Sequence, residues 1–253
     1  MTTPAGSHGA RPRTDSVRRP SRWLLHGGRP PVAWLIRRRY RVVVHGAENV
    51  PAAGAVIFAA NHVGIIDGPL LAIYAPRPVH ALTKVEMFAG FLGRFLTAAG
   101  QIPLQRFEVD PAAVKTAVRV LRDGGVVGVF PEGSRGAGEF DLFHRGAAYL
   151  AHVTGAVIVP VILFGTREPG GASSSLPRRR GTMDLVFGTP FTVEQAEWPR
   201  TRQQVGDTSH LLRARMLADL EAARRSMGLS LPGPLPAGQH EADPGGGITE
   251  KPA

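Results

Sequence analysis

The chain has 253 residues, of which 43% are hydrophobic, and a formal net charge of +10. This length and apolar content suffice for one large domain with a buried core, and no internal repeat or mid-chain linker favours two. The absence of cysteine excludes disulfides, thiolate nucleophiles and cysteine-based metal sites. No segment has the roughly 20 consecutive apolar residues of a spanning helix, and we expect no signal peptide.

The positive charge is concentrated at the start of the chain. Residues 1–41 hold ten arginines and one acidic residue, Asp15. Residues 1–22 are also rich in proline, glycine and serine, and we expect them to form a disordered basic arm. The partners that such an arm favours are anionic, either a phospholipid surface or a nucleic acid. The alternative is a solvated tail with no partner.

Short helical pieces are expected over residues 23–39, broken at Gly27-Gly28 and at Pro30-Pro31. Within them, the apolar run Trp34 to Ile36 precedes the basic run Arg37 to Arg39, a composition typical of an anchor at a membrane interface. Packing of the apolar side chains against the core would explain it equally well. The anchor hypothesis predicts peripheral attachment to an anionic membrane surface, at the cytoplasmic face of the cell membrane.

Strand and helix patterns then alternate along the chain. Apolar runs predict strands over residues 41–45, 55–60, 79–83, 126–130, 156–164 and 183–187. Helices are predicted over residues 70–74, 87–99, 111–123, 147–152 and 208–227, with Asp110 as an N-cap before Pro111. The alternation predicts an α/β fold, a mostly parallel central sheet flanked by helices on both faces. We expect a single domain over residues 23–228 and a disordered tail over residues 229–253.

The stretch NHVGIID, residues 61–67, follows the buried strand at residues 55–60. It places a histidine where a parallel strand gives way to a loop, the usual location of chemistry in open α/β sheets. On a regular helix His62 and Asp67 would point about 140° apart, so they can meet only if the backbone bends, which Gly64 permits. Asp67 could then hold one imidazole nitrogen and leave the other as a base. A lone structural histidine is the alternative.

A second strand end carries the stretch FPEGSRG, residues 130–136. Arg135 offers a planar fork of donors suited to a phosphate, and the glycines let backbone N–H groups approach an anion. The stretch is not a Walker loop, because the lysine is missing, and it is not a nucleophile elbow, because Ser134 lacks the G-x-S-x-G frame. The alternative is a turn in which Glu132 and Arg135 pair with each other.

With two further stretches, these motifs resemble the blocks of the glycerolipid acyltransferases, typified by the 1-acyl-sn-glycerol-3-phosphate acyltransferases. NHVGIID matches the NHxxxxD block of that family. FPEGSRG is similar to its FPEGTRS block, with Ser134 for threonine and Gly136 for serine. Residues 84–106 resemble its second block, and Val159-Pro160 falls where the fourth belongs. The four blocks occur in the family's order within residues 40–190.

The resemblance implies an O-acyltransferase that needs no metal and no cofactor, with an acyl-CoA or acyl-ACP thioester as co-substrate. His62, oriented by Asp67, would take the proton from the free sn-2 hydroxyl of a lysophospholipid, 1-acyl-sn-glycerol 3-phosphate, as that oxygen attacks the thioester. Phosphatidate would result. Acylation of glycerol 3-phosphate or of another lysolipid is the alternative reaction.

Roles for further residues follow from the same resemblance. Arg106 and Arg135 would bind the acceptor phosphate, with Lys84 as a further candidate. The site would be shaped by Glu132, Gly133 and Ser134, and the turn at the histidine would be fixed by Asn61. Backbone N–H groups near Gly64 or Gly133 are candidates for stabilising the tetrahedral oxyanion.

Two other functional classes compete with this hypothesis. A lipid or ester hydrolase would use water in place of the acceptor hydroxyl, although a metal held by His62, Asp67 and Glu132 is disfavoured because HxxxxD lacks the usual one-face ligand spacing. A non-catalytic basic protein could bind a membrane or a nucleic acid, but it would not need both His62 and Asp67. Few aromatic residues are interleaved with the arginines for base stacking, so we expect no nucleic-acid partner.

Overall fold

The computed structural model describes residues 12–239, 245 and 247–249. Its strands are β1 Arg41–His45, β2 Val56–Ala60, β3 Val79–Lys84, β4 Ile102–Leu104, β5 Val126–Val129, β6 Val157–Phe164 and β7 Thr182–Phe187. Its α-helices are α1 Trp23–Gly27, α2 Arg29–Arg39, α3 Asp67–Tyr74, α4 Gly90–Ala98, α5 Pro111–Arg122, α6 Gly146–Thr154 and α7 Arg202–Met227. Two short 3-10 helices, η2 Ala47–Asn49 and η3 Val85–Phe88, complete the elements.

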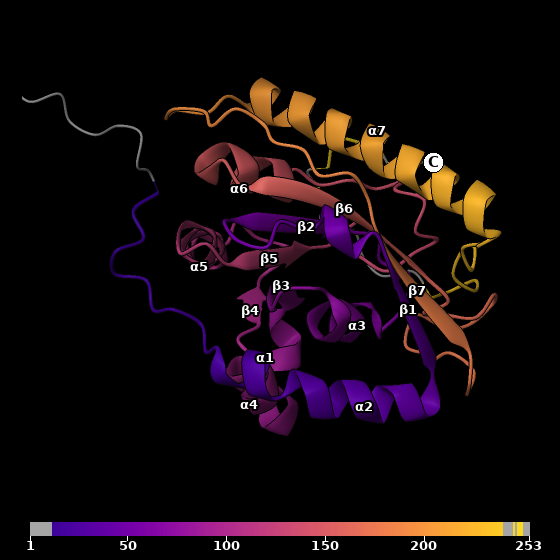
Figure 1. Cartoon of the computed structure of the whole chain (residues 1–253). Helices are drawn as coiled ribbons and strands as arrows, with labels where there is room; N and C mark the ends of the chain where they lie inside the picture. The colour runs from indigo at the N-terminus through magenta and orange to yellow at the C-terminus, as the bar shows by residue number, and fades with distance from the viewer. Residues whose placement is uncertain (1–11, 240–244, 246, 250–253) are drawn as a thin grey trace, which may run out of the picture.

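A single seven-stranded sheet separates two helical layers (Figure 1). The strand order is β1-β7-β6-β2-β5-β3-β4, and every neighbouring pair is parallel except β6 and β7. The predicted α/β fold with a mostly parallel sheet is therefore confirmed. Because the carboxyl ends of β2, β3, β5 and β6 point the same way, the loops that follow these strands share one edge of the sheet.

The two faces of the sheet bury separate cores. Ile57 and Ala59 of β2 pack with α5, α6 and α7 on one face, whereas Phe58 and Ala60 pack with α3 on the other. This division follows from the alternation of side chains along a strand. Because both faces are covered, all five residues of β2 are buried, which explains why its sequence is a continuous apolar run.

The largest differences from the predicted elements have local causes. α7 begins at Arg202, before the predicted residue 208, because Thr201 and Gln204 form a capping box. The predicted helix 87–99 is divided into η3 and α4. β4 was not predicted as a strand, and it tolerates Pro103 because it lies at the edge of the sheet. The predicted N-cap at Asp110 is confirmed, since its carboxylate accepts the N–H of Ala113 at 2.9 Å.

The helical pieces near the start of the chain break only at Gly28, between α1 and α2. Pro30 and Pro31 lie in the first turn of α2, where a missing N–H removes no intrahelical bond. Trp34 is 60% exposed, and Leu35 beside it is also exposed, while Ile36 packs against the core. α2 therefore combines both alternatives from the sequence: two of its apolar side chains are exposed, as in an interfacial anchor, and one packs against the core.

Parts of the segments predicted to be disordered are packed on the domain. Residues 12–22 form no helix or strand, yet Thr14 is buried because Arg119 and Arg122 of α5 donate hydrogen bonds to it. After α7, the N–H of Ile248 donates to the carbonyl of Phe143 at 2.8 Å. The remaining parts of those predictions, residues 1–11, 240–244, 246 and 250–253, lie outside the described residues.

Candidate active site

The candidate site begins one residue beyond β2, where Asn61 extends the pairing with β6. Its side-chain Oδ1 accepts the N–H of Leu163 at 2.7 Å, and its Nδ2 donates to the carbonyl of Leu163 at 3.1 Å. The side-chain amide of Asn61 thus satisfies both backbone groups of Leu163, as a neighbouring strand would, and Asn61 is fully buried. The chain leaving β2 is held beside β6 by this side chain, which fixes the start of the turn that carries His62.

His62 and Asp67 meet, as the bend hypothesis requires. Nδ1 of His62 lies 2.8 Å from Oδ2 of Asp67, and the same oxygen accepts the N–H groups of Val63 and Gly64 at 2.7 and 2.8 Å. Because this oxygen acts as an acceptor, we assign the imidazole hydrogen to Nδ1, which leaves Nε2 free to take a proton. The Asp67 side chain is 0% exposed and that of His62 is 17% exposed, so solvent or substrate can reach the imidazole.

Gly64 meets a steric requirement at this bend. A Cβ at this position would lie 2.5 Å from the carbonyl oxygen of Thr166, closer than real Cβ contacts allow. The turn after β2 therefore lies directly against the chain that leaves β6. The sequence suggests Gly64 for the freedom of its backbone. The structure shows that glycine is needed here because there is no room for a Cβ.

The imidazole of His62 is also held by an aromatic ring. Its centroid lies 4.3 Å from that of Phe130, with an interplanar angle of 27°. The sequence predicts Phe130 only as the end of a strand, and its place at the start of FPEGSRG is the signal that it belongs to the site. The stacking limits rotation of the imidazole, so Asp67 and Phe130 together define its orientation.

The FPEGSRG turn encloses the main chain of His62 from both sides. Oε1 of Glu132 accepts the N–H of His62 at 3.0 Å, and the N–H of Gly136 donates to the carbonyl of His62 at 2.9 Å. Gly133 has a φ of 68°, which a residue without a Cβ adopts readily. The two predicted motifs are thus joined by backbone-directed hydrogen bonds.

Glu132 is an acid in an unfavourable place for charge. Burial raises the pKa of its carboxyl well above the ordinary value of 4.5, and the carboxylates of Asp67, Asp141 and Glu139 raise it further, while the N–H of His62 lowers it. A neutral Glu132 still accepts the N–H of His62, so the turn keeps its contact in either state.

The other predicted substrate-binding residues belong to the FPEGSRG turn or lie at or just after the ends of the neighbouring strands β3 and β4. Arg106 reaches the turn, because its Nη1 donates to the carbonyl of Gly133 at 2.8 Å. Arg135 is half-buried and donates to the carbonyl of Ser173 at 3.0 Å. Ser134 is buried within the same turn. Lys84 ends β3, which is separated from β2 in the sheet by β5.

Two N–H groups in the predicted oxyanion region already have acceptors. The N–H of Gly64 is already donated to Asp67, and the N–H of Gly133 donates to the carbonyl of Phe130 at 3.0 Å. Each N–H carries one hydrogen, so neither group can serve an oxyanion while these bonds persist.

Arg167, just beyond β6, is a residue that sequence reasoning missed. It is 2% exposed, and its guanidinium donates to four backbone carbonyls, those of Val63 at 2.8 Å, Gly136 at 3.1 Å, Gly171 at 2.9 Å and Gly233 at 2.5 Å. Burial lowers its pKa, which the carboxylate of Asp67 partly offsets. Its place after the carboxyl end of a parallel strand was the signal that could have marked it.

Comparisons with known proteins identify a family for the chain. A family model described as "Acyltransferase" matches residues 41–163. The 1-acyl-sn-glycerol-3-phosphate acyltransferase of Bacillus subtilis is 30% identical over 159 residues, which cover 62% of this chain and 77% of that protein. The enzyme of the same name from Borreliella burgdorferi is 34% identical over 133 residues, 51% of this chain and 53% of that protein.

A solved structure supports the fold. The 1-acyl-sn-glycerophosphate acyltransferase PlsC of Thermotoga maritima superposes with a TM-score of 0.56 and 22% sequence identity, covering 79% of each chain. At that identity the likeness concerns the fold, whereas the Bacillus subtilis relative, matched over most of its length, identifies the family. The chain therefore belongs to the acyltransferase family and is an O-acyltransferase.

Proposed function

We propose that the enzyme transfers a fatty acyl group from acyl-CoA or acyl-ACP to the sn-2 hydroxyl of 1-acyl-sn-glycerol 3-phosphate, giving phosphatidate for phospholipid synthesis. The acceptor is suggested by the names of the relatives from Bacillus subtilis and Borreliella burgdorferi. The observation that carries the proposal is the 2.8 Å contact between His62 and Asp67. It supplies a base without an attached nucleophile, which suits direct transfer to a hydroxyl.

The chemical step needs one proton to move twice. Nε2 of His62 takes the proton of the sn-2 hydroxyl while that oxygen attacks the thioester carbonyl carbon. The tetrahedral intermediate collapses with cleavage of the C–S bond, and the departing thiolate takes the proton back from the imidazolium. Asp67 stabilises the imidazolium through Nδ1. No acyl-enzyme forms and no cofactor or metal is used, so the lack of cysteine is no obstacle.

The acceptor phosphate would be held by arginines near the FPEGSRG turn. Arg106 donates to Gly133 in that turn, and Arg135 belongs to it, so both carry positive charge at the turn whose Glu132 contacts His62. Planar guanidinium groups suit a phosphate. Glu132, Gly133 and Ser134 would shape the glycerol-phosphate site, and Lys84, at the end of β3, is a further candidate.

We further propose peripheral association with an anionic membrane, at its cytoplasmic face. No helix within the described residues is long and apolar enough to cross a bilayer. Large apolar side chains are nevertheless exposed on three helices, at Trp23 of α1, Trp34 of α2 and Phe91 of α4. These helices lie together on the lower side of Figure 1. Apolar groups beside arginines favour an interface with headgroups.

The test is acyl transfer from labelled acyl-CoA or acyl-ACP to 1-acyl-sn-glycerol 3-phosphate in detergent micelles. We expect His62→Ala to lower the rate by about 10²- to 10⁴-fold, the usual contribution of a general base. His210→Ala, at an exposed position on α7, is the matched control and should leave the rate unchanged.

Other outcomes of the same assay separate the alternatives. Acylation of glycerol 3-phosphate alone would replace the acceptor, while release of free fatty acid without any acceptor would indicate a hydrolase. A His62→Ala enzyme as fast as the unmodified protein would contradict the mechanism.

A further inference from the structure

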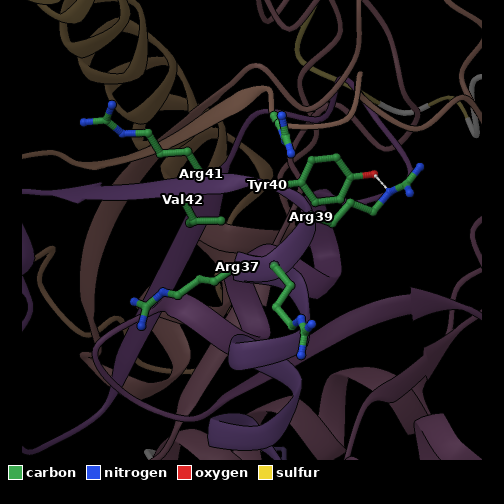
Figure 2. Close-up of a pocket in the computed structure, with 7 residues that line it drawn as sticks. Arg37, Arg39, Tyr40, Arg41 and Val42 are labelled. Carbon is green, nitrogen blue, oxygen red and sulfur yellow. Dashed lines mark hydrogen bonds between the residues drawn. The ribbon is translucent and has the colours of Figure 1, made fainter.

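Five arginines surround a hollow of about 380 Å³ on the surface of the domain (Figure 2). We call this the arginine pocket. It is lined by Arg37, Arg38, Arg39, Tyr40, Arg41, Val42 and Arg180. The lining comes from the continuous stretch that joins the end of α2 to the start of β1, and from the loop before β7, which is far from it in the sequence. In Figure 2, Arg37 and Arg41 extend to the same side, with Val42 between them.

Backbone hydrogen bonds bring the two segments together. The N–H of Arg41 donates to the carbonyl of Gly181 at 3.0 Å, and the N–H of Arg180 donates to that of Arg39 at 2.7 Å. Arg180 has a φ of 64°, a left-handed conformation that disfavours residues with a Cβ. Non-glycine residues kept in this region often belong to ligand-binding sites. Arg180 is thus presented to the pocket by a backbone conformation that its side chain does not favour.

The charge of the pocket is not neutralised by neighbouring carboxylates. Within residues 12–239, 245 and 247–249, none of the five arginines forms an ion pair with an acidic side chain. Three of them lie over aromatic rings instead, Arg37 over Tyr74, Arg38 over Trp34 and Arg39 over Tyr40, at 5.2, 4.8 and 5.5 Å. A ring contacts the face of a guanidinium and leaves N–H groups at its edge for an anion.

Helix chemistry explains only part of this cluster. Basic residues in the last turn of a helix complement its dipole, which accounts for Arg37, Arg38 and Arg39. Arg41 lies on β1 and Arg180 lies in the loop before β7, outside any helix. The helix dipole does not explain why these two arginines line the same hollow, whereas binding of an anionic ligand would.

We propose that the arginine pocket binds the phosphate of an anionic phospholipid headgroup at the membrane surface, separately from the acceptor site. This rests on the membrane association proposed above. The pocket adjoins the exposed Trp34 and Leu35 of α2, and Arg38 lies on the ring of Trp34. A side chain able to enter the interface and a cation for the headgroup are therefore neighbours.

The pocket also lies at the sheet edge that carries His62. Arg41 pairs with Thr182, Thr182 contacts Gly165 at the end of β6, and the next residue, Thr166, contacts Gly64. This chain of contacts connects the start of β1 with the turn that holds the proposed base. A headgroup bound in the pocket would turn that edge toward the leaflet that supplies the lysophospholipid.

The test compares binding to vesicles of phosphatidylcholine with and without phosphatidylglycerol, measured by co-sedimentation without an acyl donor. The variant Arg41→Gln/Arg180→Gly removes two pocket charges, and glycine adopts the left-handed conformation readily, so its melting temperature should not fall. We expect its affinity for the anionic vesicles to drop by about 30-fold. The control Arg202→Gln/Arg225→Gln removes the same charge from α7 on the opposite face and should lose less than about threefold.

Two results would overturn the proposal. Equal losses in the pocket variant and in the α7 control would show that net charge alone drives the binding. A titration with free CoA, without vesicles, should give the same affinity for the unmodified protein and the pocket variant, and a loss in the variant would assign the pocket to a soluble phosphate. Neither measurement depends on acyl transfer, so failure here is distinguishable from failure of the proposed reaction.

Discussion

Nε of Arg167 donates a hydrogen bond of 2.8 Å to the carbonyl oxygen of Val63, the residue that follows the proposed base. The same guanidinium donates to Gly136, at the end of the FPEGSRG turn. One buried side chain thus links the two loops that hold His62. Because the guanidinium supplies donors in several fixed directions, no other cationic side chain can form the same hydrogen bonds to these carbonyls.

Arg167→Lys should lower kcat by about 10- to 100-fold, because a small displacement of the base is enough for such a loss. KM for both substrates should change little, since Arg167 is buried and far less accessible than the imidazole. Steady-state kinetics with Arg178→Lys as the control would measure this, because Arg178 is an exposed arginine of the following loop. An Arg167→Lys enzyme with full kcat would remove the positioning role.

Asp67→Asn should reduce kcat by about 10³-fold, because an amide cannot stabilise the imidazolium and favours the wrong tautomer of His62. The amide oxygen can still accept from Val63 or Gly64, so the fold should survive. Kinetics and thermal melting would be measured together. Asp110→Asn is the matched control, since asparagine is as good an N-cap as aspartate. Equal kcat for both variants would contradict the pairing of His62 with Asp67.

Gly64→Ala should destabilise the protein by about 1–3 kcal/mol, the usual cost of overpacking, and should lower activity by displacing the turn. The reason is the 2.5 Å approach of the new Cβ to the carbonyl of Thr166. Gly68→Ala is a control four residues away, in α3, where a Cβ meets nothing within 4 Å. That variant should be neutral or slightly more stable. Denaturant unfolding of both variants would measure the difference, and equal stabilities would refute the steric argument.

Glu132 should make stability depend on pH. Its pKa is raised in the folded state above the ordinary 4.5, so the folded protein binds a proton more tightly than the unfolded chain. The associated stability is complete below about pH 4.5 and is lost as the pH rises through the folded-state pKa, with a slope of up to about 1.4 kcal/mol per pH unit. Glu132→Gln keeps an acceptor for His62 and should remove this loss.

The measurement for Glu132 is the free energy of unfolding of both proteins from about pH 5 to about pH 8. All other titrating groups are common to the two, so the difference between the curves isolates Glu132. Parallel curves would show that folding does not raise the pKa of Glu132.

Phe91→Ser should weaken binding to anionic vesicles by about tenfold, since burial of an aromatic side chain is worth a little over one power of ten. Phe91 is 87% exposed on α4, so the substitution leaves the core intact. Leu211→Ser removes an exposed apolar side chain from α7, on the other face, and is the control. Unchanged binding of the Phe91 variant would exclude α4 from the membrane surface.

Local patterns predicted the positions of most elements and the two motifs. The run before NHVGIID predicts β2 because five apolar residues in a row are typical of a strand covered on both faces. His62 and Asp67 could be paired because Gly64, which lies between them, permits the bend that their spacing requires. The start of α7 was also encoded, in the Thr201 and Gln204 capping box, and was missed although the signal is local.

The residues that the sequence could not supply depend on distant contacts. Arg167 lies 104 positions from Val63, and Arg180 reaches Arg39 only because β1 pairs with β7. The hydrophobic pattern of a segment predicts that it forms a strand, but it does not predict which strand pairs with it. Phe130 lies within a motif that the sequence does reveal. Its stacking on His62 could still not be predicted, because the contact depends on the path of the FPEGSRG turn.

The hydrogen bond from Arg167 to Gly233 has a consequence for biosynthesis. Gly233 follows α7 and is translated 66 residues after Arg167. A nascent chain that ends with α7 already contains both motif loops, but one carbonyl around the buried guanidinium is still missing. The surroundings of Arg167 are therefore completed only once translation has passed residue 233, so the loops around His62 gain their full support only after the whole of α7 has been synthesised.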